Sequence, residues 1–324
     1  MKVFELLKNK ALENKKTIVF PEGTDSRILN AAARLNEGGY LEPIVLGNPK
    51  AVTAAAQKAN IDLGSIEIID MANYNGFDKM LADLVDLRNG KNSEEQCRKM
   101  LEQPSYFGTM LVYEKKADGM VSGATHSTAD TVRPALQIIK TKKNMSRVSG
   151  AMIMEKDDEK YIFADCAINI DPDSETLAEI AYQSAQTAKM LKMDPKVAML
   201  SFSTKGSAQG PMVEKVVEAT EIMHEKHPEI ACDGELQFDA AFVPAVGESK
   251  APGSSVAGHA NVFIFPELQS GNIAYKVAQR MGNYQAVGPV LQGLAAPIND
   301  LSRGASSEDV FLLGILTAAQ ANME

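Results

Sequence analysis

A short polar segment near the C-terminus combines residue types that can do acid–base and charge-stabilising chemistry. Residues 299–309 read Asn-Asp-Leu-Ser-Arg-Gly-Ala-Ser-Ser-Glu-Asp, so Ser302 and Arg303 precede a glycine and Asp309 follows closely. A guanidinium stabilises developing negative charge, and a carboxylate can accept a proton. The spacing Ser306-x-x-Asp309 is also typical of a capping box, in which the acid only stabilises the first helical turn. From spacing alone the cap is favoured, and catalysis stays open.

Four further segments share one design, in which the end of an expected strand leads through small and hydroxyl residues into a helix. In parallel α/β sheets this arrangement presents free amides and helix starts to anionic ligands. These segments are 21–27, 122–128 with the following Arg133, 203–207 and 233–239. Arg133 beside an expected helix start is unfavourable against the helix dipole unless an anion joins it, which favours an anion site there. His126 could be a general base, although a histidine in a polar turn is more often a structural hydrogen-bonding residue.

The remaining segments have alternative interpretations. The segment 21–27 fits a helix cap by Asp25 or Ser26 with a solvated Arg27. The segment 203–207, Ser-Thr-Lys-Gly-Ser, resembles a phosphate cradle but lacks the full P-loop pattern, so nucleotide hydrolysis is not indicated. The segment 233–239 holds three carboxylates, but no histidine or further carboxylate completes a ligand set. We therefore expect no metal.

The elements that must position these segments alternate between strands and helices. Expected strands cover 17–20, 41–46, 65–70 and 117–122, with amphipathic stretches between them. This rhythm predicts an α/β fold with a parallel sheet and helices on both faces. Two runs, 149–155 and 160–167, then suggest a hairpin. The rhythm resumes with strands at 197–202, 235–238 and 261–265, a strand-like run at 288–294 and a helix at 307–320.

Length and composition limit the organisation and the partners. A chain of 324 residues is about twice a typical domain. We expect one domain from 1–147 with 288–324, a second from 148–287, and a ligand-binding cleft between them. The net charge of −9 without a basic block argues against nucleic acid. No run of 18 apolar residues or secretory signal is found, and the three cysteines are widely spaced. These features predict a cytoplasmic protein without a membrane segment.

The chain resembles the phosphate acetyl/butyryl transferases in several motifs that occur in order from about residue 17 onward. They include Ser122-Gly-Ala-Thr-His-Ser-Thr, Ser203-Thr-Lys-Gly-Ser and Asp300-Leu-Ser-Arg-Gly. Further matching motifs lie at 133–141, 163–169, 233–237, 256–266 and 271–276. Several long motifs in order are far more specific than any single glycine loop.

The resemblance implies a two-lobed fold like that of the isocitrate and isopropylmalate dehydrogenases, with the active site between the lobes. It implies a homodimer that transfers an acetyl group between acetyl phosphate and coenzyme A, with coenzyme A as a substrate and phosphate as the other product. It assigns Asp309 as the base for the thiol, with Ser302 and Arg303 holding the acyl phosphate. It also implies that Arg27, Arg88 and Arg133 bind substrate or coenzyme. Candidate binding donors from the loop segments are Ser127, Thr128, Ser203, Lys205 and Gly206.

Three other functions remain to be weighed. A butyryl transferase would differ by only about 1–3 kcal/mol of pocket contacts, which inspection of the sequence does not resolve. A decarboxylating 2-hydroxyacid dehydrogenase would need a metal set and a nicotinamide site, and the sequence offers neither convincingly. A non-catalytic acetyl-coenzyme A sensor is less favoured because Ser302, Arg303 and Asp309 occur together.

Overall fold

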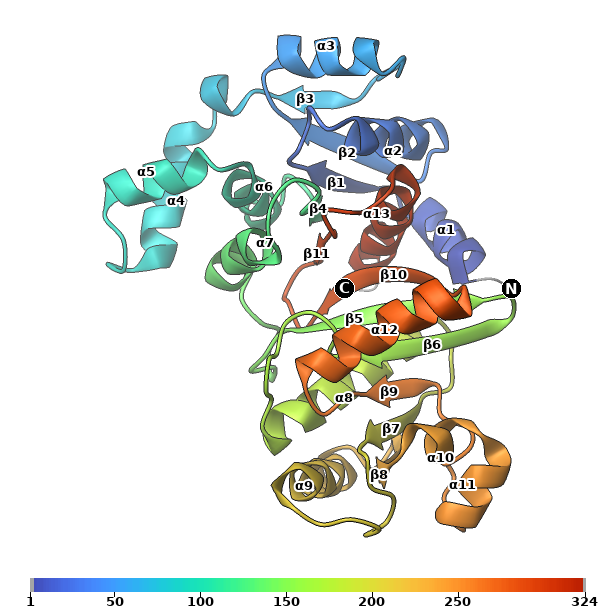
Figure 1. The fold of residues 1–324 in the computed structure, drawn as a ribbon. Coiled ribbons are helices and arrows are strands. Elements are labelled where there is room, and N and C mark those ends of the chain that lie inside the picture. The colour runs from blue at the N-terminus through green and yellow to red at the C-terminus, as the bar shows by residue number, and fades with distance from the viewer. Residues whose placement is uncertain (1–2, 323–324) are drawn as a thin grey trace. The chain divides into compact units, whose positions relative to one another are not determined.

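The chain folds into two α/β units in the computed structural model, which describes residues 3–322 (Figure 1). One unit comprises Phe4–Lys143 together with the chain from Leu294 on, and the other comprises Asn144–Gly293. We call them the first and the second unit. The fold class expected from the alternating pattern, α/β with parallel strands, is confirmed in both.

A five-stranded parallel sheet forms the centre of the first unit. Its strand order is β11-β4-β1-β2-β3. The strands are β1 (Lys16–Phe20), β2 (Leu41–Leu46), β3 (Glu67–Ile69), β4 (Gly119–Ser122) and β11 (Ile298–Asp300). Because β11, β4 and β1 are parallel neighbours, the chain leaves all three at the same edge of the sheet. The strand β11 was not expected, since a run of three residues gives no periodic signal.

Helices of the first unit pack on this sheet and on one another. They are α1 (Val3–Glu13), α2 (Ser26–Glu37), α3 (Pro49–Lys58), α4 (Phe77–Arg88), α5 (Glu94–Leu101), α6 (Pro104–Tyr113), α7 (Thr128–Pro134) and α13 (Ser307–Ala321), with short turns η1 (Met71–Asn73) and η2 (Ala135–Ile139). The helix expected at 307–320 is confirmed as α13. It is buried over ten consecutive residues, 310–319. A Cβ at Gly314 would lie 2.8 Å from Leu35 of α2, so glycine permits this close helix packing.

The second unit contains a six-stranded mixed sheet. Its order is β10-β5-β6-β9-β7-β8. The strands are β5 (Ser149–Lys156), β6 (Glu159–Ala164), β7 (Lys196–Leu200), β8 (Ala231–Leu236), β9 (Val262–Ile264) and β10 (Gln285–Gln292). The hairpin predicted from the two adjacent runs is confirmed, because β5 and β6 pair antiparallel. The strands β6, β9, β7 and β8 are parallel.

One strand differs in position from the division drawn on the sequence. The strand-like run from 288 was expected to begin the return to the first domain, but β10 pairs antiparallel with β5 in the second unit. The chain enters the first unit only at Leu294. Residues of β10 are buried in runs rather than in alternation, and such a pattern by itself does not choose between the two sheets.

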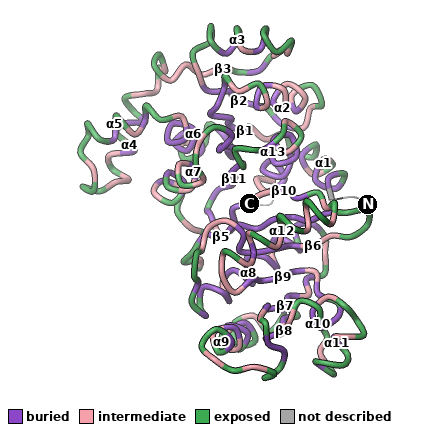
Figure 2. The backbone as a smooth tube through the Cα atoms, in the orientation of Figure 1, coloured by how far each residue is buried: buried purple, intermediate pink, exposed green. Residues whose placement is uncertain are grey.

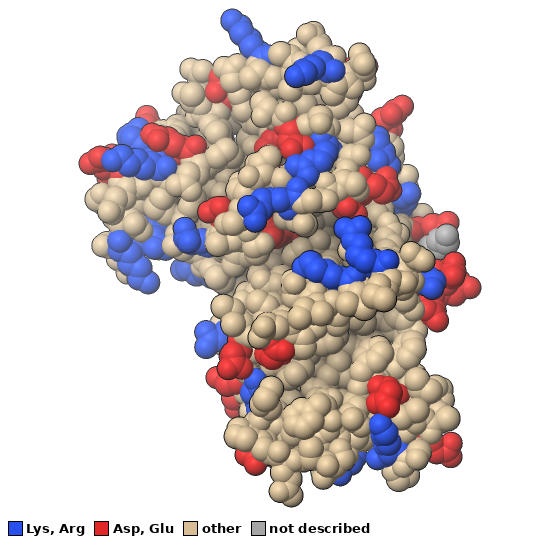
Figure 3. Space-filling view, viewed as in Figure 1, with Lys and Arg blue, Asp and Glu red and all other residues tan. Residues whose placement is uncertain are grey.

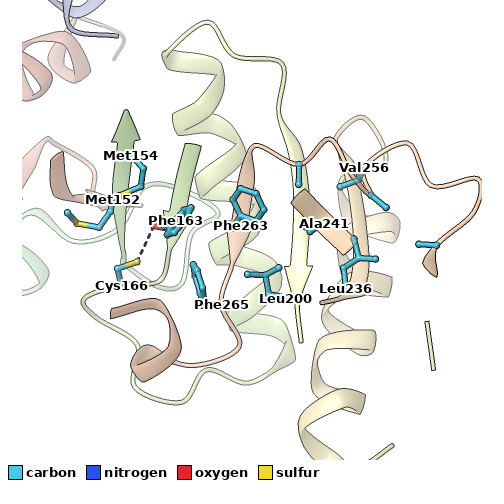
Figure 4. Packing of buried hydrophobic residues seen from close by; sticks show 14 of the residues in the cluster. Met152, Met154, Phe163, Cys166, Leu200, Leu236, Ala241, Val256, Phe263 and Phe265 are labelled. Atoms are coloured by element: carbon cyan, nitrogen blue, oxygen red, sulfur yellow. Dashed lines mark hydrogen bonds between the residues drawn. The ribbon is translucent and has the colours of Figure 1, made fainter. Parts of the chain in front are cut away.

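The core of the second unit lies around β6 and β9. Its helices are α8 (Ser174–Met190), α9 (Pro211–Lys226), α10 (Phe238–Phe242), α11 (Pro244–Lys250) and α12 (Leu268–Gly282). Figure 4 shows Phe163, Phe263 and Phe265 close together within a cluster of buried side chains. The ring centroid of Phe163 lies 5.5 Å from that of Phe263, edge-on, and 5.3 Å from that of Phe265, tilted. Such pairs add to the free energy gained by burial.

Burial and charge follow the pattern of an α/β protein. Figure 2 shows buried residues along the strands and exposed ones on the outer helices and loops. Figure 3 shows acidic and basic side chains interspersed on the visible face. No helix within residues 3–322 is long and apolar enough to cross a membrane.

Candidate active site

Three adjacent strands of the first unit each lead through a short loop into a helix. The chain passes from β1 into α2, from β4 into α7 and from β11 into α13. Register pairs Asp300 with Ser122, and the Leu301 amide donates to the Ser122 carbonyl at 2.7 Å. The segments 21–27, 122–128 and 299–309, which lie far apart in the sequence, therefore meet at one edge of the sheet.

Arg27 ties these loops together through five hydrogen bonds. Its Nε and Nη2 donate to Asp25, Nη2 also donates to the Ala124 carbonyl, and Nη1 donates to the Arg303 and Ala305 carbonyls, all at 2.8–3.0 Å. A guanidinium has five N–H donors, so these bonds use its full capacity. The interpretation of Arg27 as a solvated residue is therefore wrong. In this structure Arg27 fixes the loop that carries Ser302 and Arg303.

Asp25 has two roles in this arrangement. Its carboxylate caps α2 by accepting the Arg27 amide at 2.9 Å, and Asp25 was one of the two residues, with Ser26, that the sequence offered as a cap. Burial would raise the pKa of Asp25, but the hydrogen bonds and charge of Arg27 outweigh burial and lower it. The carboxylate therefore stays ionised and keeps the guanidinium in place.

Glu22 organises the loop that follows β4. Its Oε1 accepts the Gly123 and Thr125 amides at 3.0 Å and lies 3.3 Å from the Thr125 hydroxyl. Glu22 is buried, and its Oε2 has no hydrogen-bond partner among the described residues. The loop amides that could bind an external anion are thus partly occupied by the protein's own carboxylate.

His126 lies against the same carboxylate. Its Nε2 is 3.4 Å from Glu22 Oε1 and 3.3 Å from the Ser122 hydroxyl. Its Nδ1 is buried and has no partner within the described part of the chain. These contacts agree with a structural histidine.

Asp300 lies at the end of β11, two residues before Ser302. Its side chain is buried, and its Oδ2 accepts the Thr128 hydroxyl at 2.6 Å. Burial raises the pKa of Asp300 to about 6, and the nearby Glu22 raises it too, whereas Thr128 and His126 lower it. Sequence inspection selected neither Asp300 nor Glu22. Glu22 lies two residues after β1, a strand that the sequence predicts, so its position was a usable signal, whereas Asp300 ends the unpredicted strand β11 and had no such signal.

The three candidate catalytic residues lie at the start of α13. Ser302 and Arg303 are exposed, and Asp309 is half-buried. The Ser306 amide and hydroxyl both donate to Asp309 Oδ2 at 2.8 Å, and the Asp309 amide donates to the Ser306 hydroxyl at 3.2 Å. The capping box predicted from the spacing is confirmed. Both bonds to the carboxylate use Oδ2, so the capping box does not engage Oδ1.

The start of α7 holds two more candidate binding residues. The Ser127 amide and hydroxyl donate to Asp130 at 3.1 Å and 2.7 Å, so this pair also forms a helix cap. These bonds lower the pKa of Asp130. The Thr128 hydroxyl donates to Asp300. The donors expected to bind an anion here are therefore engaged by carboxylates of the chain itself.

Arg88 and Arg133 lie near a common phenol. Burial raises the pKa of Tyr106, and the positive charges of Arg133 and Arg88 both oppose that increase. The Tyr106 hydroxyl donates to Gln137 at 2.9 Å, and Arg88 Nε donates to Asn92 at 2.8 Å. Two arginines separated by 45 positions in the sequence thus provide positive charge near one side chain.

The loop 203–207 belongs to the second unit. The Ser203 hydroxyl and the Gly206 amide donate to the buried Glu235 at 2.9 Å and 2.7 Å. Lys205 forms an ion pair with Asp233 and donates to the Gly234 carbonyl at 2.8 Å. Burial would raise the pKa of Asp233, but the bonds from Lys205 and Ser254 outweigh it. The loop has the donors of a phosphate cradle, and two carboxylates of the chain occupy them.

The structure thus places the candidate residues in separate groups. Those of the three strand-end loops in the first unit come together: Arg27, Ser127, Thr128, Ser302, Arg303 and Asp309. Arg88 and Arg133 belong to the same unit outside these three loops, and Ser203, Lys205 and Gly206 belong to the other unit. Within residues 3–322 no three or more His, Cys, Asp or Glu side chains form a group that could hold a metal ion.

An α/β chain with hydroxyl and arginine side chains at the helix starts of one sheet edge has the features of an enzyme for anionic substrates. The sequence profile described as phosphate acetyl/butaryl transferase matches residues 2–318. The chain therefore belongs to the phosphate acetyl/butaryl transferase family, whose members are acyltransferases.

Three relatives define how close the similarity is. A phosphate acetyltransferase of Bacillus subtilis is 56% identical over 319 residues, which cover 98% of this chain and 99% of the relative. A phosphotransacetylase structure from Streptococcus pyogenes superposes with a TM-score of 0.95 at 56% identity, covering 99% and 98%. A branched-chain phosphotransacylase from Enterococcus faecalis has a TM-score of 0.69 at 20% identity, covering 94% and 99%, and shares the fold.

Proposed function

We propose that this protein catalyses the reversible transfer of an acetyl group between acetyl phosphate and coenzyme A. The proposal is supported by relatives at 55–56% identity that are phosphate acetyltransferases. The observation that carries it is the network around Arg27, which fixes Ser302 and Arg303 beside the loop after β4. An acyl phosphate needs such a combination of amides, hydroxyls and a guanidinium.

The proposed reaction is a direct attack in a ternary complex. The coenzyme thiol gives its proton to Asp309, and the thiolate attacks the carbonyl carbon of acetyl phosphate. The bond from that carbon to the bridging oxygen breaks, its electron pair remains on phosphate, and phosphate takes up the proton. Arg303 stabilises the negative charge on the thiolate and the carbonyl oxygen, and Ser302 donates to the acyl phosphate.

The proton transfer needs help from Arg303. A free thiol and a free aspartate carboxyl have pKa values of about 8.5 and about 3.9, a difference equivalent to about 6 kcal/mol. A guanidinium close to the sulfur lowers this cost by stabilising the thiolate. The capping bonds to Asp309 use only Oδ2, so the same carboxylate can cap α13 and take a proton on Oδ1.

The other candidate residues have proposed roles in binding. Arg88 and Arg133 bind phosphate groups of coenzyme A, which is supported by the positive charge that both exert on Tyr106. Ser127 and Thr128 bind the acyl phosphate at the start of α7. Ser203, Lys205 and Gly206 bind coenzyme only if it displaces Glu235 and Asp233 from their donors. Coenzyme A acts as a substrate, and no metal is proposed.

We also propose that the protein works as a homodimer in the cytoplasm. All three cysteines are free and buried, which agrees with a reducing compartment. Light scattering on a size-exclusion column measures the subunit number directly. A monomeric mass for a fully active sample contradicts the dimer.

Two alternative functions, a butyryl transferase and a non-catalytic sensor, can be distinguished by which substrates the protein turns over. A butyryl transferase would use butyryl phosphate with a higher kcat/KM than acetyl phosphate. A sensor would bind acetyl-coenzyme A without turning it over. The identity to phosphate acetyltransferases favours acetyl as the acyl group and favours catalysis.

The deciding experiment is a thioester absorbance assay with acetyl phosphate and coenzyme A. Wild type and Asp309→Asn are compared after thermal unfolding has shown that both are folded. We expect turnover by wild type and loss of most of the rate in the variant. If the rate of the variant nearly matches that of wild type, Asp309 acts only as a helix cap. If wild type forms no thioester from acetyl phosphate or butyryl phosphate, the transferase function is contradicted.

A further inference from the structure

We propose that Asp300 is a positioning residue that takes up a proton when the anionic substrate binds and thereby turns the Thr128 hydroxyl toward that anion. The inference rests on the proposed function, because it assigns the acyl phosphate to the loop after β4. It concerns a carboxyl group that the proposed reaction does not use.

Asp300 is buried at the end of β11, beside Ser122 of β4 and Thr128 of α7. Its exposed fraction is 1%. Oδ2 accepts the Thr128 hydroxyl at 2.6 Å, whereas Oδ1 has no hydrogen-bond partner among the residues described. A Cβ on Gly123 would lie 2.4 Å from Oδ1, and Gly123 has a φ of +114°. Only glycine at this position leaves room for the carboxylate.

A buried carboxylate with an unpartnered oxygen costs stability. Desolvation penalises the ionised form, and burial accordingly raises the pKa of Asp300 to about 6. An asparagine has the same shape and would avoid this cost. A costly ionisable group beside candidate binding residues is typical of a functional site.

The charged groups around Asp300 come from two neighbouring loops. His126 favours its ionised form, and Glu22 disfavours it. From α7, the buried Thr131 hydroxyl also favours the ionised form but has no hydrogen bond of good geometry in the described structure. From α13, Thr317 and Gln320 contact Asn299 rather than Asp300, and Asp309 bonds to Ser306.

The Thr128 hydroxyl has a single hydrogen, so it can donate either to Asp300 or to a bound anion, but not to both. While Asp300 is ionised, Thr128 donates that hydrogen to the carboxylate and has none for a ligand. When Asp300 is protonated, the carboxyl donates to the Thr128 oxygen, and the hydroxyl can donate to a phosphate. An anion bound nearby disfavours the ionised carboxyl, so binding and proton uptake promote each other.

The test uses sulfate, an anion that does not titrate near neutral pH, with the complete protein. Isothermal titration calorimetry gives the dissociation constant between about pH 5 and about pH 8. A fully coupled proton makes this constant rise about tenfold per pH unit above about pH 6. Titrations in buffers of different ionisation enthalpy should show uptake of close to one proton per sulfate at pH 8.

Three variants identify the group. Asp300→Asn, whose amide imitates the protonated carboxyl, should bind sulfate at high pH as tightly as wild type does at low pH, with a flat profile. Thr128→Val should lose the gain in affinity at low pH. Asp130→Asn is the matched control, since Asp130 also accepts a hydroxyl on this loop but its pKa is lowered, and its slope should match wild type.

Several outcomes overturn the inference. A wild-type slope that persists in Asp300→Asn assigns the proton to another group, such as His126. If the dissociation constant of Thr128→Val depends on pH as strongly as that of wild type, Asp300 acts by charge repulsion alone and the Thr128 hydroxyl has no part in the coupling. A flat profile in wild type excludes proton coupling. The thioester assay is run separately, so failure of the transferase function is recognised by absence of turnover, whatever the sulfate profiles show.

Discussion

Two loops of this molecule follow the same design and differ in how their donors are satisfied. In the second unit, the donors of 203–207 are paired with Glu235 and Asp233, and the loop is complete without a ligand. In the first unit, the loop after β4 also meets carboxylates, but Glu22, His126 and Asp300 each keep a buried atom without a partner among the described residues. Buried polar groups are rarely left in this state unless a ligand or a proton completes them.

The difference separates a loop whose donors are paired within the chain from a loop that keeps unpartnered buried atoms of the described residues beside it. Both loops would be called phosphate cradles from their residue types. Only the first is joined by Arg27 to the loop that carries Ser302 and Arg303. We therefore place the reacting groups in the first unit and expect the largest effects of substitution there.

Arg303→Ala should have the largest effect. Removal of one preorganised charge-stabilising donor costs about 10²–10³ in kcat. Steady-state kinetics in the thioester assay measure the loss. Arg98→Ala is the control, because Arg98 is a surface residue of α5 that pairs with Glu94 at 3.7 Å. A loss smaller than about tenfold in Arg303→Ala would remove the distinction drawn between the two loops.

Arg27→Lys should destabilise the first unit by about 2–3 kcal/mol, because lysine cannot supply five planar donors to Asp25 and three carbonyls. Urea unfolding measures the change, and kcat should fall with it as the Ser302 loop loosens. An unchanged unfolding midpoint would mean that the three carbonyls find other donors. The hydrogen bonds of Arg27 between the loops would then contribute nothing to stability.

Asp300→Asn should change the pH dependence of stability by about 2 kcal/mol between about pH 4.5 and about pH 7.5. The folded-state pKa of Asp300, about 6, lies above the usual value of 3.8. The folded protein therefore binds more protons than the unfolded chain, so stability is fully present below the usual pKa and falls as pH rises through the folded value. The asparagine variant lacks this fall.

The difference in free energy of unfolding between variant and wild type isolates this group, since all other carboxyls titrate in both proteins. It should grow in favour of the variant as pH rises. A difference independent of pH would mean that Asp300 is ionised in the native state throughout this range.

Lys205→Ala should have the smallest effect, a rise of less than about fivefold in KM for coenzyme A, or under about 1 kcal/mol. Asp233 already neutralises much of the lysine charge. A rise of a hundredfold would show that coenzyme displaces Asp233, and the second loop would then be a binding site equal to the first.

The fold was predictable where periodicity was strong, and the site only where residue types were distinctive. The hairpin of β5 and β6, four of the five strands of the first sheet and α13 follow from regular patterns over several residues. The strand β11 comprises only Ile298–Asp300 and is too short for a pattern, yet it positions the loop that begins with Ser302. The cap at Asp309 was visible as Ser306-x-x-Asp309 because helix capping is a local interaction.

The sequence by itself determined the α/β class, the family and the local caps, because these depend on periodicity, long motifs and contacts within a few residues. Only the tertiary structure decided that Arg27 donates three of its five hydrogen bonds to loops about 100 and 280 residues away, and that Asp300 is buried against Thr128. The reason is that hydrogen-bond partners and desolvation depend on which strand ends lie side by side. Parallel pairing brings Asp300, Ser122 and Glu22 together at one edge, and no local pattern records that pairing.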